Sequence, residues 1–136
     1  MSFLWIGIAL MVTFAITLIV LVAKERAPAP DDVAVAYERA WDRLDFATLW
    51  ELSGIELRDG RDRSAFIAAK REAYAGQTAL RGVVRGVTAS TISLSPESAV
   101  VVTTLTTDAP PTLRNQCTLA RRSGRWFVIG YSHAAS

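Results

Sequence analysis

An unbroken run of apolar residues lies near the start of the chain. Residues 3–23 contain no charged residue and no proline, and their only side-chain hydroxyls are those of Thr13 and Thr17. As a helix this run would be about 30 Å long, which matches the hydrocarbon core of a bilayer. Each threonine hydroxyl can bond the carbonyl one turn back, which satisfies it in lipid. The pattern predicts a transmembrane helix over residues 1–23, with a domain tethered to one face of the membrane.

The flanks of this run bear on its processing and its orientation. No Lys or Arg precedes it, and it is longer than the apolar core of most signal peptides, which favours an anchor over a cleaved leader. Lys24 and Arg26 follow it, and positively charged flanks favour the cytoplasm. We therefore expect a cytoplasmic domain, with the extracytoplasmic side as the alternative. Residues 24–30 form a short linker that Pro28 and Pro30 stiffen.

After the linker, apolar residues recur at helical spacing. A first helix is expected to begin at Asp31 or Asp32, each of which can cap a helix. The apolar stripe of this helix consists of Val33, Ala36, Tyr37, Ala40, Trp41 and Leu44. Its opposite, solvated face is expected to carry Glu38, Arg39, Asp42 and Arg43. The pattern predicts a helix that buries one face and exposes the other.

Two shorter helices are expected next. Asp45 can cap the first of them, which ends at Gly54. Residues 55–57 alternate between apolar and polar, which predicts a short strand. A turn follows, and Asp62 or Ser64 then caps the last helix.

Strands are predicted for the C-terminal part of the chain, where β-branched residues and short alternations prevail. The four expected strands cover residues 80–94, 99–107, 113–122 and 125–132. Gly82 and Gly86 indicate a bend or bulge in the first strand, and Ser123-Gly124 is typical of a tight hairpin turn. Helices that precede an antiparallel meander predict an α+β domain over residues 31–136, with three helices packed on one face of a curved sheet.

Two segments resemble a known superfamily. Residues 34–50, where a long amphipathic helix runs into Asp45 and a second helix, are similar to the opening of the nuclear transport factor 2-like (SnoaL-like) superfamily. Leu44 stands where that superfamily usually has glycine. Residues 121–128, with a glycine turn before a basic residue and Trp126, resemble its last hairpin. The resemblance implies a cone-shaped domain, in which a bent sheet wraps around the long helix and leaves one end open.

Residue counts exclude several classes of site. The chain has 136 residues, a net charge of +2, one histidine and one cysteine. An internal disulfide is therefore impossible, and no metal site is predicted. His133 is expected to be solvated, and Cys117 is expected to be buried in a strand. Because no phosphate-binding glycine loop, Ser-His-Asp set or dinucleotide fingerprint is present, no catalytic residue and no cofactor is predicted.

The implied cone raises the question of a ligand pocket. Enzymes of the resembled superfamily place an acid or base and a tyrosine inside the cone, but we match none of their catalytic positions to a residue here. Aromatic residues are the candidates for a pocket lining, and these are Tyr37, Trp41, Trp50, Tyr74 and Tyr131. Aromatic residues at helical spacing usually form core. An open cone would favour an enzyme, whereas a cone filled by side chains would exclude one.

Charge is unevenly distributed along the domain. Residues 31–76 hold ten acidic and seven basic residues, whereas residues 77–136 hold two acidic and six basic residues. The six are Arg81, Arg85, Arg114, Arg121, Arg122 and Arg125. Arginines an even number of positions apart in a strand share a face, which predicts a basic surface for lipid phosphates or an acidic protein. The alternative is a merely solvated sheet face. Nucleic acid is not expected, because the charge is mild and no aromatic residues alternate with the arginines.

Together these patterns predict a non-catalytic, single-pass bacterial membrane protein. Its domain would serve as an interaction or assembly module, as an accessory subunit of a membrane complex. The expected partners are lipid along residues 3–23 and a protein at the membrane, or a second copy bound through the sheet. The alternative is a small-molecule-binding protein or enzyme that uses a pocket inside the cone.

Overall fold

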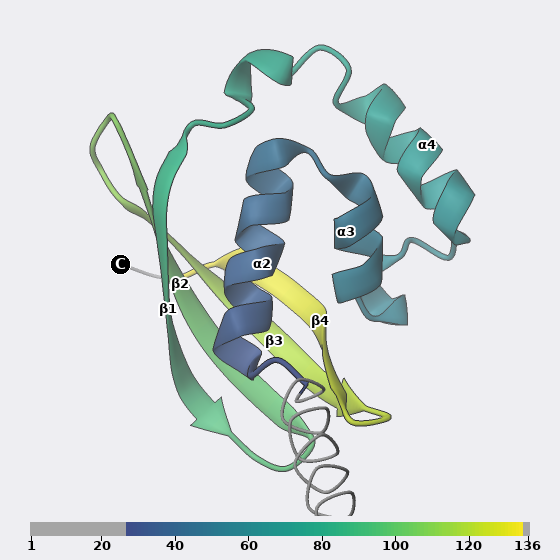
Figure 1. Ribbon diagram of the computed structural model, residues 1–136, viewed down its shortest axis with the longest axis vertical. Coiled ribbons are helices and arrows are strands. Elements are labelled where there is room, and N and C mark those ends of the chain that lie inside the picture. Colours follow the sequence, from purple (N-terminus) through teal and green to yellow (C-terminus); the bar gives the residue numbers. More distant parts are fainter. Residues whose placement is uncertain (1–26, 135–136) are drawn as a thin grey trace, which may run out of the picture.

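The computed structural model describes residues 27–134, which fold as three α-helices on a four-stranded antiparallel sheet (Figure 1). This confirms the predicted α+β class and the order of helices before strands. The stretch 3–23, which predicts a transmembrane helix, lies outside the described residues. Among residues 27–134, no helix combines the length and the apolar character needed to cross a membrane.

Helix α2 spans Pro30–Arg43 and packs against β1, β2 and β4 (Figure 1). It begins before the predicted start, because proline is well suited to a first helical position, where no N–H partner is needed. The Ala29 N–H donates to Asp32 Oδ2 at 3.3 Å, which satisfies one backbone group at this end. Leu44 closes the helix with φ at 52°.

The buried face of α2 differs from the predicted stripe. Ala34 and Glu38 are buried, whereas Ala36 is exposed and Trp41 is only partly buried. The prediction that Glu38 lies on a solvated face is therefore wrong. Its physical reason is the curvature of the sheet, which contacts α2 from both flanks and so buries more than one stripe of the helix.

Helix α3 spans Phe46–Leu52 and begins at the predicted cap. Asp45 Oδ1 accepts a hydrogen bond from the Thr48 N–H at 3.1 Å, and Asp45 Oδ2 accepts one from the Thr48 hydroxyl at 2.6 Å. Helix α4 spans Arg63–Ala73, and its cap is Asp62, one of the two predicted candidates. Helix α3 packs against α2, and α4 packs against α3 (Figure 1).

The predicted strand over residues 55–57 is wrong, because Ile55–Leu57 forms a 3₁₀ turn, η1. The chain pairs with the sheet just before this turn: Ser53 bridges Val128 of β4, and the Gly54 N–H donates to the Val128 carbonyl at 2.7 Å. The segment therefore covers the edge of β4 for one step and then turns away. Covering an edge in this way blocks unwanted strand pairing there.

The four strands follow one another in a meander. They are β1 (Val84–Leu94), β2 (Ser98–Thr107), β3 (Leu113–Arg122) and β4 (Arg125–His133). Strand β1 starts later than predicted, because Thr78–Leu80 forms a second 3₁₀ turn, η2. Register shifts in β1 between Val84 and Gly86 and between Thr91 and Ser93 are bulges, of which the first lies at a predicted glycine.

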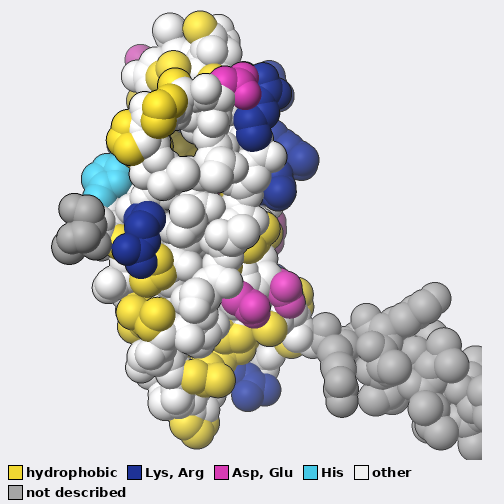
Figure 2. Space-filling model, turned by 90° about the vertical axis from the view of Figure 1, so that its left-hand side faces the viewer, with side chains coloured by type: hydrophobic (Ala, Val, Ile, Leu, Met, Phe, Trp, Pro, Cys, Tyr) yellow, Lys and Arg dark blue, Asp and Glu magenta, His cyan; other side chains and the backbone are white. Residues whose placement is uncertain are grey.

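The core lies between the helices and the inner face of the sheet. Buried positions alternate along β2 and β3, as the predicted strand pattern requires. The core residues are Val33, Ala34, Tyr37, Ala40, Phe46, Leu49, Phe66, Ala99, Val101, Cys117, Leu119 and Val128. In the part of the chain that the structure describes, no helix covers the other face of the sheet (Figure 1). On the β1 side of the molecule, charged side chains lie toward the margins and the centre is mainly uncharged (Figure 2).

Candidate functional site

A buried carboxylate joins α2 to three strands. Glu38 is 2% exposed, and each of its hydrogen bonds comes from a different strand. Oε1 accepts from the Thr103 hydroxyl of β2 at 2.7 Å and from Asn115 Nδ2 of β3 at 3.0 Å. Oε2 accepts from the Tyr131 hydroxyl of β4 at 2.8 Å. A carboxylate can only accept hydrogen bonds, and these three donors match that requirement.

The network continues from Glu38 to the surface. Asn115 Nδ2 lies 2.8 Å from the Tyr131 hydroxyl, so the amide donates to that oxygen as well as to Glu38. Asn115 Oδ1 lies 2.9 Å from Nδ1 of His133, whose side chain is exposed. Because the amide oxygen is an acceptor, the Nδ1–H of His133 donates to it. His133 is therefore exposed, as predicted, but it also ends a chain of polar contacts that starts in the core.

Burial raises the pKa values of two tyrosine hydroxyls and one thiol near Glu38. The pKa of Tyr131 is raised far above its ordinary value, first by burial of the hydroxyl and then by the charge of Glu38. Burial raises the pKa of the Cys117 thiol to about 12, and Glu38 adds to this effect. Burial also raises the pKa of Tyr37. All three shifts favour the protonated forms, because burial disfavours the charged thiolate and phenolate.

The predicted pocket-lining aromatic residues fill space. Tyr37 is 4% exposed, and its ring centroid lies 5.2 Å from that of Tyr131 and 6.5 Å from that of Trp41. Tyr74 extends the cluster, with 5.5 Å between its ring centroid and that of Trp41. Trp50 lies apart and packs at 5.5 Å against Phe66 of α4. The structure thus brings four of the five residues together as one packed cluster.

Three cavities lie at the surface, and their walls include neither Glu38 nor a member of this aromatic cluster. One, of about 250 Å³, is formed at the ends of β3 and β4 and includes Arg114 and His133 in its wall. Another, of about 290 Å³, lies between the Ser53–Gly54 segment and Phe127. A third, of about 530 Å³, lies where the described chain begins, beside Trp126.

The six predicted basic residues do not form one surface. Arg81 lies in the connection before β1, so the prediction that it shares a strand face with Arg85 is wrong. Arg114 is exposed near the start of β3. Arg121 and Arg125 flank the β3–β4 turn, where the Arg125 guanidinium lies 5.2 Å from the centroid of Phe127.

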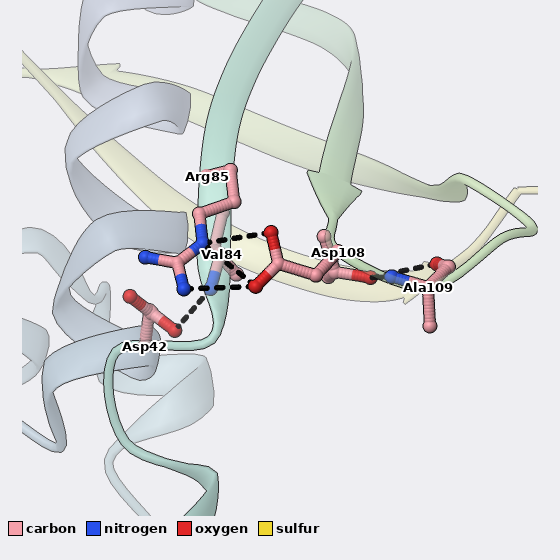
Figure 3. A network of polar contacts seen from close by, with 6 residues as sticks. Asp42, Val84, Arg85, Asp108 and Ala109 are labelled. Atoms are coloured by element: carbon pink, nitrogen blue, oxygen red, sulfur yellow. Dashed lines mark hydrogen bonds and ion pairs between the residues drawn. The ribbon is translucent and has the colours of Figure 1, made fainter.

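Two of the arginines are held by carboxylates. Arg85 binds Asp108 through two nitrogens, with Nη2 at 2.8 Å from Oδ2 and Nε at 3.1 Å from Oδ1 (Figure 3). The pKa of Asp108 is lowered by these hydrogen bonds. Beside this pair, the Val84 N–H donates to Asp42 of α2 at 3.0 Å (Figure 3). Arg122 forms an ion pair with Glu56 of η1. These contacts join β1 to Asp108 of the β2–β3 connection and to α2, and they join β3 to η1.

Sequence reasoning missed Glu38, Thr103 and Asn115 as one unit. A signal was available in β3, because Asn115, Cys117 and Leu119 occupy every second position and so share the inner face of the sheet. A polar side chain at such a position requires a buried partner. The partner came from a helix 77 residues away in sequence, and helical spacing alone placed it on the wrong face.

Comparisons with known proteins leave the chain without a family. No protein-family model matches it, and no curated protein matches it. Among solved structures it is similar to the solution structure of a SEC-C motif containing protein from Rhodopseudomonas palustris, with 18% sequence identity and a TM-score of 0.48. The similarity covers 85% of this chain and 87% of that chain. At this level the similarity carries no argument about function.

The predicted membership in the nuclear transport factor 2-like superfamily is wrong. No family model supports the assignment, and the similar solved structure named above is that of a SEC-C motif protein. The two segments that carried the resemblance encode packing: a helix that runs into a capped second helix, and a glycine turn before a tryptophan. Such patterns fit many small α+β domains, because they specify caps and turns rather than chemistry.

Proposed function

We propose that this chain is a membrane-anchored, non-catalytic interaction or assembly module that serves as an accessory subunit of a membrane complex. The observation that carries the proposal is the packing between α2 and the sheet, where Glu38 is 2% exposed and receives hydrogen bonds from Thr103, Asn115 and Tyr131. An enzyme of the cone-pocket type would need an open volume beside its acid or base. The three cavities described above are lined by other residues than Glu38.

The anchor rests on the apolar run of residues 3–23, and the cytoplasmic location rests on Lys24 and Arg26. The test uses the full chain with a C-terminal reporter. We expect the chain to stay with membranes after an alkaline carbonate wash. A C-terminal fusion to green fluorescent protein should be fluorescent, and a C-terminal fusion to alkaline phosphatase should be inactive. An active phosphatase fusion would place the domain outside the cytoplasm, and release by carbonate would remove the anchor from the proposal.

The outer face of the sheet is the surface that best suits a protein partner, such as a second copy. Its central residues are small and uncharged, and they are Thr88, Ser90, Val100, Val102, Thr104, Gln116 and Thr118. Val102 is only 9% exposed on this face, which indicates a flat, closely packed surface. Flat surfaces with few charges suit protein interfaces, whose cores are depleted in charged residues.

Photo-crosslinking in intact membranes tests this surface. We would place a crosslinking residue at Thr104 of the outer face and, as the matched control, at Ser64, which is exposed on α4. We expect a discrete adduct of twice the chain mass, or of one other defined mass, from position 104 alone. Equal adducts from both positions, or none from position 104, would contradict the proposed interface.

A second candidate function is binding of a small anion. It is favoured by the cavity of about 250 Å³ that Arg114 and His133 line, since the Arg114 guanidinium can donate to an anion and so can Nε2 of His133 when the ring is protonated. Titration of the full chain with inorganic phosphate, followed by the His133 ring signals in an NMR spectrum, tests it. Saturable shifts that are lost in Arg114→Gln would favour this function, and unchanged signals at millimolar phosphate would exclude it for phosphate.

A further inference from the structure

We propose that one end of the domain, the tether pole, lies within the lipid headgroup layer and contacts it directly. The tether pole consists of Leu94, Ser95, Pro96, Arg121, Gly124, Arg125 and Trp126, together with residues 27–30. The inference rests on the proposed anchor and goes beyond it, because it specifies which surface of the domain faces the lipid.

The first support is the place where the described chain begins. Residues 27–30 line the cavity of about 530 Å³ together with residues of the β1–β2 turn and the β3–β4 turn. Both turns lie at the lower end of the molecule in Figure 1, beside the start of α2. The β2–β3 turn lies at the opposite end (Figure 1). The long axis of the sheet therefore runs from a tethered end to a free end.

The second support is the short connection. Only residues 24–26 separate the apolar run from Ala27, and three residues extend at most about 14 Å between their neighbours. The headgroup and interfacial layer is roughly 5–7 Å thick on each side of the hydrocarbon core. A tether of this length keeps the tether pole at or near that layer.

The third support is the apolar character of this end. Leu94 is 65% exposed and Ile92, two residues earlier, is 61% exposed. Hydrophobic side chains gather at both ends of the face in Figure 2, and the lower group lies close to the start of the described chain. Trp126 is half-buried beside them, and tryptophan is enriched at membrane–water interfaces. Such a surface gains by contact with the boundary between headgroups and acyl chains.

Charge contributes locally rather than as a net field. Arg121 and Arg125 are exposed, and among the ion pairs of the described residues neither has a carboxylate partner. Their guanidinium groups can bind lipid phosphates, which occur in zwitterionic and anionic lipids alike. Three acidic residues lie at the same end: Asp31 and Asp32 follow residues 27–30 directly, and the carbonyl of Glu97 accepts a hydrogen bond from the Arg121 N–H. This end therefore carries no basic excess. Contact should therefore depend little on anionic lipid.

Lipid-borne quenching in vesicles tests the proposal. Cys117 is buried with a raised pKa, so one introduced cysteine in the full chain can be labelled selectively with a fluorophore. The probe site is Ser95→Cys, and the control is Ala109→Cys in the β2–β3 turn at the free end. In phosphatidylcholine vesicles with nitroxide-labelled headgroups, we expect several-fold stronger quenching at position 95 than at position 109. Addition of phosphatidylglycerol should change the ratio by less than about twofold, because the charge near this end is balanced.

Two outcomes separate this inference from the anchor on which it rests. Equal or absent quenching at both positions in protein that still floats with the vesicles would overturn the tether pole and leave the anchor intact. Protein that no longer floats after a salt wash would overturn the anchor and, with it, this inference.

A pair of matched variants tests the contact itself. Leu94→Gln alters an exposed leucine of the tether pole, and Leu113→Gln alters one that is 50% exposed at the start of β3, near the free end. We expect quenching at position 95 to fall at least twofold in Leu94→Gln and to stay unchanged in Leu113→Gln, with both melting temperatures near that of the original chain. Equal quenching in the two variants would show that Leu94 makes no lipid contact.

Discussion

Glu38 connects one helix to three strands through a single side chain. Its removal leaves the donors on Thr103, Asn115 and Tyr131 without this acceptor. Leaving a buried donor unsatisfied costs roughly 1–3 kcal/mol of unfolding free energy. We expect Glu38→Ala to lower the stability of the domain by about 3 kcal/mol, measured by urea denaturation.

The control for this variant is Arg39→Ala, which makes the same truncation at the next, exposed position of α2. It should change stability by less than about 0.5 kcal/mol. A cost for Glu38→Ala as small as that of the control would mean that the network contributes nothing net to folding.

The raised pKa values of Tyr131 and Cys117 predict alkaline unfolding. In the unfolded chain these groups lose their protons near 10.0 and 9.0, whereas the folded protein holds the protons to higher pH. Above about pH 9 the unfolded state therefore binds fewer protons, and stability falls as pH rises. We expect the melting temperature to be level from pH 7 to 8.5 and to drop steadily by pH 10.5. In Cys117→Ala, the drop between pH 9 and 10.5 should be smaller, and a flat profile in the original chain would contradict the prediction.

At the scale of the elements, the β3–β4 hairpin depends on its two-residue turn. Ser123 and Gly124 have φ of 51° and 76°, the left-handed pair of a type I′ turn, which matches the sequence prediction. An alanine at the second position is strained, and we expect Gly124→Ala to cost about 1 kcal/mol. The control is Gly76→Ala. A Cβ at position 76 meets nothing within 4 Å, and the backbone of Gly76 is not in the left-handed region. Thermal melts that fail to separate the two variants would contradict this reading of the turn.

Local signals predicted most of the elements, and contacts distant in sequence explain the failures. Asp45 and Asp62 cap helices because a carboxylate reaches backbone N–H groups three residues on, an interaction that is visible in the sequence. Residues 55–57 alternate like a strand, yet they form η1 after Ser53 and Gly54 meet the edge of β4. That edge is more than 70 residues away along the chain, so no local pattern could reveal it.

At the scale of the whole molecule, the order of helices and strands was predictable and the superfamily was not. The α+β class follows from helical spacing before residue 80 and alternation after it. The contacts of α2 with β1, β2 and β4 join residues far apart in the chain, and they bury Glu38. The candidate site was missed because its central residue had been assigned to solvent.

The second bulge in β1 leaves Ile92 outside the pairing with β2, as the first bulge leaves Arg85. Thr91 pairs with Val101 and Ser93 pairs with the next residue, Val100, so Ile92 has no partner across the ladder. A chain shortened by this one residue would run through the same pairs as a regular strand. We expect deletion of Ile92 to keep the melting temperature within about 5 °C of the original, whereas deletion of Ala89, which pairs with Thr103, should unfold the domain by shifting the register. The position of Ile92 is thus dispensable for pairing, and it holds a large apolar side chain that is 61% exposed. At that position, the length of the chain can change independently of the sheet that it forms.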